Sequence, residues 1–176
     1  MSSNHERYGS LHSRFLDTVG DGTGSIDQNV NGSVTPVDFK ILCPPGVTYE
    51  INQASVLIRD TGTLDTDKYG NGIALTNGFS IVTSRPTRAP VEINYTVQHP
   101  ILTNGSWAAY TSDIKHFTFG SGSQILSITY HFRQEGRPIK LGEGEAFIFR
   151  VNDNLAGLNE HHVRAGMTVY PAVYVP

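Results

Sequence analysis

Two runs of alternating apolar and polar residues within positions 124–154 constrain the fold more than any other feature of this chain. The first run has its apolar residues at Leu126, Ile128, Tyr130 and Phe132, and the second has them at Phe147, Phe149 and Val151. Because successive side chains of a strand point to opposite faces, each run predicts a strand that buries one face. The stretch 134–145 between them is charged and rich in glycine, which predicts an exposed loop. We therefore expect two central strands of a β-sandwich here.

Shorter segments with the same alternation predict further strands between residue 37 and the end of the chain. They lie at 37–43, 49–60, 91–97, 114–119 and 167–175, and 73–81 predicts a hairpin that turns at Asn77-Gly78. No segment has the hydrophobic period of an amphipathic helix. About eight or nine short strands without a helix indicate an all-β, antiparallel β-sandwich. A jelly roll is the favoured version, and an immunoglobulin-like sandwich is the second.

Local signals add detail to these strands. Asn52-Gln53 interrupts an apolar pattern and predicts a β-bulge. Pro171 predicts that the last strand lies at a sheet edge, because proline cannot donate a ladder hydrogen bond. The segment 155–164 is expected to form a loop or one helical turn. It contains His161 and His162, whose side chains diverge in either regular structure because they are adjacent.

Residues 1–36 differ from the rest of the chain, since they are polar and contain several glycines. Such a composition is a poor strand or helix former. Segments of this kind are disordered or become ordered on a neighbouring molecule. We therefore predict an irregular N-terminal arm over residues 1–36 and a β-sandwich domain over residues 37–176. Arg14, Phe15 and Leu16 are the candidate anchor of this arm on a partner.

The composition bears on partners and compartment. Charged residues make up 16% of the 176 residues, below the roughly 25% of soluble domains, which fits a protein that packs against others. The net charge of −3 and the lack of a basic run argue against nucleic acid as a partner. No apolar run approaches the ~20 residues that span a bilayer, so no membrane partner is expected. Cys43 is the only cysteine, and the N-terminus lacks a signal-peptide pattern, so synthesis in a cytoplasm is expected.

The sequence contains no recognised motif for catalysis or for a cofactor. Cys43 lies in no nucleophile motif, and the histidines lack the spacing of cupin metal ligands. Asp17–Gly24 has part of the spacing of an EF-hand loop, but Val19 and Gln28 occupy two ligand positions. A glycine-rich turn, in which aspartate side chains accept hydrogen bonds from backbone amides, is the favoured interpretation. We therefore expect no enzyme activity, cofactor or metal site, while calcium binding by the aspartate-rich loops stays open.

Three stretches of the sequence resemble small virion proteins of tailed bacteriophages. They are Phe15-Leu-Asp-Thr-Val-Gly-Asp-Gly-Thr-Gly, Ile58-Arg-Asp-Thr-Gly-Thr-Leu-Asp-Thr-Asp-Lys-Tyr-Gly-Asn-Gly-Ile-Ala-Leu-Thr-Asn-Gly and Val151-Asn-Asp-Asn-Leu-Ala-Gly-Leu-Asn-Glu-His. They cover a minority of the residues, from near the N-terminus to near the C-terminus, and they are turn-like rather than chemical. The resemblance implies a capsid decoration (cement) protein at the capsid surface of the virion, built as a jelly roll. It also implies the major capsid protein as partner and a homotrimer as assembly, but it carries over no functional residue.

A cement protein would need exposed residues that contact the capsid. Besides the arm residues, we expect Arg137 and Lys140 in the loop 134–145 to bind the partner, because they concentrate charge in a sparsely charged chain. Many copies on a shell would multiply a modest contact into large stabilisation.

Two other functions stay open. A head-fibre or tail-associated structural protein would use the same sandwich. A carbohydrate-binding β-sandwich module would use Trp107 and Tyr110 as a stacking platform for a glycan, although a lone Trp more often fills a core.

Overall fold

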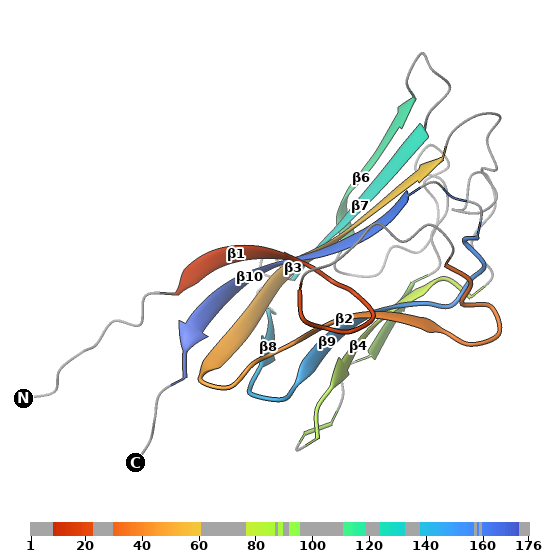
Figure 1. Cartoon of the computed structure of the whole chain (residues 1–176). Coiled ribbons are helices and arrows are strands. Elements are labelled where there is room, and N and C mark those ends of the chain that lie inside the picture. The colour runs from red at the N-terminus through yellow and green to blue at the C-terminus, as the bar shows by residue number, and fades with distance from the viewer. Residues whose placement is uncertain are drawn as a thin grey trace, which may run out of the picture.

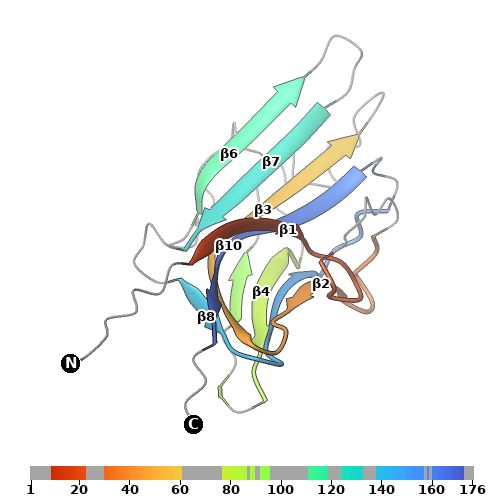
Figure 2. The ribbon, with the colours of Figure 1, turned by 60° about the vertical axis from the view of Figure 1, so that its left-hand side comes forward.

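The protein folds into two antiparallel sheets, as the computed structural model in Figure 1 and Figure 2 shows. The structure describes residues 9–22, 30–60, 77–86, 88–89, 92–95, 111–118, 124–132, 138–156, 158 and 160–172. Within these residues all regular structure is strand, which confirms the predicted all-β, antiparallel fold.

Among the described residues, the larger sheet has six strands and the smaller sheet has four. The larger one contains, in spatial order, β1 (Ser10–Phe15), β10 (Glu160–Pro171), β3 (Val47–Asp60), β7 (Gln124–His131) and β6 (Thr111–Thr118), and β8 (Ile139–Leu141) also pairs with β3. The smaller one contains β2 (Val37–Leu42), β9 (Ala146–Val151), β4 (Phe79–Ser84) and β5 (Glu92–Tyr95).

One set of strand pairs is nested along the chain. The first strand pairs with the last (β1 with β10), the second with the one before it (β2 with β9), β3 with β7 and β8, and β4 with β5. The chain therefore runs like one long hairpin whose successive pairs fall in alternate sheets. In both views β6, β7 and the C-terminal end of β3 extend past the four-stranded sheet.

The core lies between the sheets, where aromatic side chains from both sheets meet. Tyr130 of β7 lies 6.3 Å from Phe149 of β9, measured between ring centroids. Phe132 lies 6.0 Å from Phe147 in an edge-on arrangement. All four were predicted as core residues, and all four are at most 1% exposed. The side chains of Leu126 and Ile128 lie outside the described residues. The two alternating runs therefore supply one strand to each sheet, and their apolar faces meet.

The stretch 134–145 is not wholly an exposed loop, because it contains β8. Ile139 and Leu141 are buried and flank the exposed Lys140, a period of two over three residues. Residues 139–141 pair with Tyr49–Ile51 of β3. The prediction is wrong here because a three-residue alternation is too short to recognise among charged and glycine residues. Arg137 lies outside the described residues.

The irregular arm predicted over residues 1–36 is also wrong in part, because Ser10–Phe15 forms β1. Its six residues pair with β10, from Ser10 opposite Val169 to Phe15 opposite Arg164. Leu16 and Val30 are 1% and 2% exposed and belong to the core. Leu16 therefore packs inside its own chain and is not available as an anchor on a partner. The backbone hydrogen bonds offered by β10 order a segment that has no apolar period of its own.

The last strand begins earlier than predicted and lies inside its sheet rather than at the edge. β10 starts at Glu160, so the expected loop or helical turn over 155–164 is wrong for residues 160–164. Pro171 is the last residue of β10. The pairing of β10 with β1 ends two residues earlier, at Val169, so the missing N–H of Pro171 interrupts no hydrogen bond to β1. Because β1 covers the other side, β10 is an interior strand rather than an edge.

Two details of β3 and β10 agree with the sequence. Gln53 pairs with Gly166 and Ile51 with Met167, which leaves Asn52 as an extra residue and confirms the predicted bulge.

His161 points inward and is 1% exposed, whereas His162 points to the outer face. The His161 ring lies 5.0 Å from Phe39, and neither ring nitrogen has a hydrogen-bond partner among the described residues.

Candidate functional site: the Arg14 pocket

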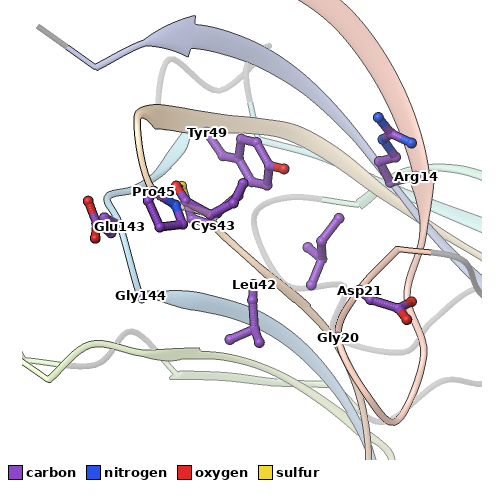
Figure 3. A pocket seen from close by; sticks show the side chains of 11 residues that line it. Arg14, Gly20, Asp21, Leu42, Cys43, Pro45, Tyr49, Glu143 and Gly144 are labelled. Atoms are coloured by element: carbon purple, nitrogen blue, oxygen red, sulfur yellow. The ribbon is translucent and has the colours of Figure 1, made fainter.

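A pocket of about 620 Å³ opens between the edge strand β1 and the end of β2, and Figure 3 shows it from close by. Two turns, at residues 17–22 and 142–145, complete its wall together with the first residues of β3. Its lining residues are Arg14, Gly20, Asp21, Ile41, Leu42, Cys43, Pro44, Pro45, Tyr49, Glu143 and Gly144. We call it the Arg14 pocket. Its volume is in the range of about 300–1,000 Å³ that is typical of binding sites.

The Arg14 pocket combines an apolar wall with charged residues at its rim. Leu42 is 45% exposed, and Val19, next to the lining residue Gly20, is 68% exposed. In Figure 3, Tyr49 and Leu42 lie on one side, with Arg14 and Asp21 on the other. Exposed apolar side chains that gather round a hollow mark a surface for binding another molecule.

The turn at residues 17–22 is held by the Asp17 side chain. Its carboxylate accepts hydrogen bonds from the backbone N–H of Gly20 and, at 3.1 Å, from that of Gly22. Both glycines have positive φ, 97° and 79°, which other residues rarely adopt. Leu42 donates its N–H to the carbonyl of Gly20 at 3.0 Å, so the turn closes the open side of β2.

These two hydrogen bonds confirm the predicted glycine-rich turn, in which an aspartate side chain accepts from backbone amides. Within the described residues, no three His, Cys, Asp or Glu side chains are grouped so that they could hold a metal ion.

Replacing Asp17 by Ala is expected to lower the free energy of unfolding by about 1–3 kcal/mol, since two turn amides lose their acceptor. Urea titration would measure the change, and added calcium should leave the midpoint of the wild-type protein unchanged. A calcium-dependent rise of that midpoint, abolished in Asp17→Ala, would contradict our interpretation of the turn.

The turn at residues 142–145 is fixed by Glu145, which is 4% exposed. Its carboxylate accepts hydrogen bonds from Arg88, at 2.8 Å from Nε and also from Nη2, and from the N–H of Gly142 at 2.7 Å. The hydrogen bond from Arg88 is the largest cause that lowers the pKa of Glu145 below its ordinary value, so this side chain stays charged. Arg88 also binds the Lys140 carbonyl at 3.2 Å, which ties β8 to the same turn.

Cys43 and Tyr49 are not activated as nucleophiles. Cys43 is buried, and burial raises the pKa of its thiol, so it is neutral at pH 7. Its sulfur lies 3.5 Å from the carbonyl oxygen of Val47 and 3.6 Å from that of Leu141. Burial also raises the pKa of Tyr49. Because a thiolate, not a thiol, is the nucleophile, this arrangement favours binding over a covalent step.

Arg14 is the distinctive group of the pocket. It belongs to β1, its side chain is exposed, and among the described residues no ion pair involves it. An unpaired guanidinium beside an apolar wall can form a bidentate pair with a carboxylate from another molecule.

The structure does not bring the five predicted partner-binding residues together. Arg14 lines the pocket, whereas Phe15 points to the outer face of the larger sheet, where its ring lies beneath the Arg164 guanidinium. Leu16 is in the core, Lys140 is exposed on β8, and Arg137 lies outside the described residues.

Sequence reasoning missed the rest of the pocket, which Leu42, Pro45, Tyr49, Asp21 and Glu143 form with Arg14. The one available signal was Pro44-Pro45-Gly46 after a strand, and it indicates a turn without indicating a site.

Comparisons with protein-family models, with curated proteins and with solved structures find no match for this chain. No helix in the part of the chain that the structure describes is long and apolar enough to cross a membrane.

Proposed function

We propose that this chain is a structural protein of a tailed-phage virion that decorates and stabilises the capsid shell by binding the major capsid protein. The observation that carries the binding role is the Arg14 pocket, where exposed apolar residues lie opposite an arginine that has no ion pair among the described residues. The assignment to a virion rests on the sequence resemblance. In this proposal the protein is not an enzyme, its place is the capsid surface, and it assembles as a homotrimer.

The strand order supports a jelly roll as the finer description of the fold. Jelly rolls consist of two facing sheets formed by a doubled Greek key. The nested pairs, with β1 next to β10 and β2 next to β9 in the opposite sheet, have this character. In this description β6 and β8 are additions to an eight-stranded arrangement, since β6 extends the edge at β7 and, in the described part of the chain, β8 pairs only with β3.

The pocket defines the chemistry of the capsid segment that it would accept. Ile41, Leu42 and Pro45 suit an apolar side chain, and Arg14 suits a carboxylate close to it. We therefore propose that the capsid protein inserts an apolar residue adjacent to an Asp or Glu. The two fixed turns keep the pocket preformed, which lowers the entropic cost of binding.

Arg14→Gln is expected to weaken binding to capsids about tenfold or more, because a lost hydrogen bond to a charged group costs about 1.5–3 kcal/mol. Leu42→Ser should act in the same direction by removing exposed apolar surface. The measurement is cosedimentation of the purified protein with phage capsids from which this chain has been removed. Arg164→Gln, which removes an arginine from the outer sheet face, is the matched control and should bind as the wild type does. Equal binding by all four proteins would exclude the Arg14 pocket as the contact.

The alternatives predict other outcomes. A head-fibre or tail-associated structural protein would bind fibre or tail assemblies but not stripped capsids. A carbohydrate-binding module acting through Trp107 and Tyr110, both outside the described residues, would lose glycan binding in Trp107→Ala.

A further inference from the structure

The outer face of the six-stranded sheet carries a groove lined by both polar and apolar side chains, separate from the Arg14 pocket. It consists of two adjoining hollows of about 240 Å³ and 400 Å³ that share Ser13, Gln53 and Gly166. Ser55, Leu57, Ser127, His162 and Arg164 complete the smaller hollow, and we call the whole the outer groove. His162 Nε2 lies 3.5 Å from a carboxylate oxygen of Glu160. It crosses β1, β10, β3 and β7, which lie side by side in Figure 2.

Small residues create the depth of the outer groove. A Cβ atom at Gly166 would lie 2.8 Å from Cγ of Gln53, so the glycine makes room for the Gln53 side chain over β10. The β-bulge at Asn52 adds a further polar side chain, which donates a hydrogen bond from Nδ2 to Thr168 Oγ1 at 2.9 Å. Asn52 Oδ1 has no hydrogen-bond partner among the described residues.

Arg164 supplies the charge of the outer groove. Its guanidinium lies 4.1 Å from the centroid of the Phe15 ring, and that contact orients it at the side of the smaller hollow. Glu160, an acid on the same strand, pairs with Arg59 at 2.8 Å. Within the described part of the chain no carboxylate pairs with Arg164, so its bidentate donors are available to a ligand.

We propose that the outer groove binds an acidic saccharide, with Arg164 on the carboxylate of one sugar and Ser13, Gln53 and Ser127 on ring hydroxyls. Serine hydroxyls and the glutamine amide both donate and accept hydrogen bonds, which matches the hydroxyl groups of a sugar. An unpaired arginine at one side selects a sugar that carries a carboxylate. This site is independent of capsid binding, because its residues are not those of the Arg14 pocket.

Isothermal titration of the full chain with trigalacturonic acid, with maltotriose and with sulfate tests this inference. Trigalacturonic acid should bind tightest, and Arg164→Gln should weaken it about tenfold or more, since the charge-assisted pair is lost. Ser127→Leu should also weaken it by filling the smaller hollow. Arg14→Gln should leave this binding unchanged while it weakens capsid binding, so the two sites fail separately.

Four outcomes would overturn the inference. They are the absence of trigalacturonic acid binding, unchanged binding by folded Arg164→Gln and Ser127→Leu proteins, maltotriose or sulfate binding as tight as the acidic saccharide, and an equal loss in Arg14→Gln. Circular dichroism and thermal midpoints of each variant establish that it is folded before titration.

Discussion

Lowering the pH from 7 to 5 is expected to reduce the free energy of unfolding by about 2 kcal/mol, and by about 3 kcal/mol at pH 4, through His161 alone. Burial of this ring lowers the pKa of His161 from its ordinary 6.5 to about 3. Below pH 6.5 the unfolded chain therefore binds a proton that the folded protein does not. The contribution of His161 to the free energy of unfolding is fully present above pH 6.5. It is lost as the pH falls through the window from 6.5 to about 3.

The variant His161→Leu isolates this contribution, because leucine has a similar volume and no titratable group. Denaturant titrations at pH 7, 6 and 5 should give nearly constant stability for the variant between pH 6.5 and 5. The matched control is His162→Gln, which alters the neighbouring histidine on the outer face and should keep the wild-type slope.

Glu145 also contributes to the pH dependence of stability, but at lower pH, so it does not interfere with the measurement of His161 between pH 7 and 5. The hydrogen bond from Arg88 lowers the pKa of Glu145, so its contribution is present above its ordinary value of 4.5 and is lost as the pH falls through the folded-state pKa. Above pH 5 its effect is small. An unchanged slope in His161→Leu between pH 6.5 and 5 would show that His161 is not buried in its neutral form.

Leu16→Ala is expected to destabilise the protein by about 2–5 kcal/mol, the cost of removing a fully buried leucine side chain. Leu16 is 1% exposed, and its N–H donates to the carbonyl of Val163 at 2.9 Å, so it joins the end of β1 to the core. Leu11→Ala is the matched control within the same segment. Leu11 is 77% exposed, and its loss should change stability by no more than about 0.5 kcal/mol.

The comparison decides between two roles for the N-terminal segment. As a core residue, Leu16 affects stability, and folded Leu16→Ala protein should still bind capsids. As an anchor of a detached arm, it would affect capsid binding and leave stability unchanged. Denaturant titration and capsid cosedimentation of the same samples distinguish these roles, and the second result would contradict the position of β1 in the sheet.

The sequence predicts the elements whose side chains carry a strong period. The runs around Tyr130 and Phe149 have large apolar residues at every second position, so strand type and buried face follow directly. The bulge at Asn52 was predictable because Asn52-Gln53 interrupts such an apolar pattern. The glycine-rich turn at Asp17 was also predictable, because glycine readily adopts positive φ and an aspartate side chain accepts hydrogen bonds from nearby backbone amides.

The elements that the sequence did not reveal depend on tertiary contacts. β1 has the residues Ser-Leu-His-Ser-Arg-Phe without an apolar period, and its pairing with β10 supplies the order. In β10 the inward positions begin with His161, a polar type that concealed the alternation with Val163 and Ala165. The Arg14 pocket forms only where two turns far apart in the chain both contact the end of β2, so no local pattern indicates it.

Imaging of the native virion at a resolution that traces side chains tests the central proposal most directly. We expect this chain on the outer surface of the capsid, with the Arg14 pocket against the major capsid protein and Arg14 facing an Asp or Glu of that protein. Density for this chain on the tail or a fibre, its absence from the particle, or an Arg14 pocket open to solvent would contradict the proposal.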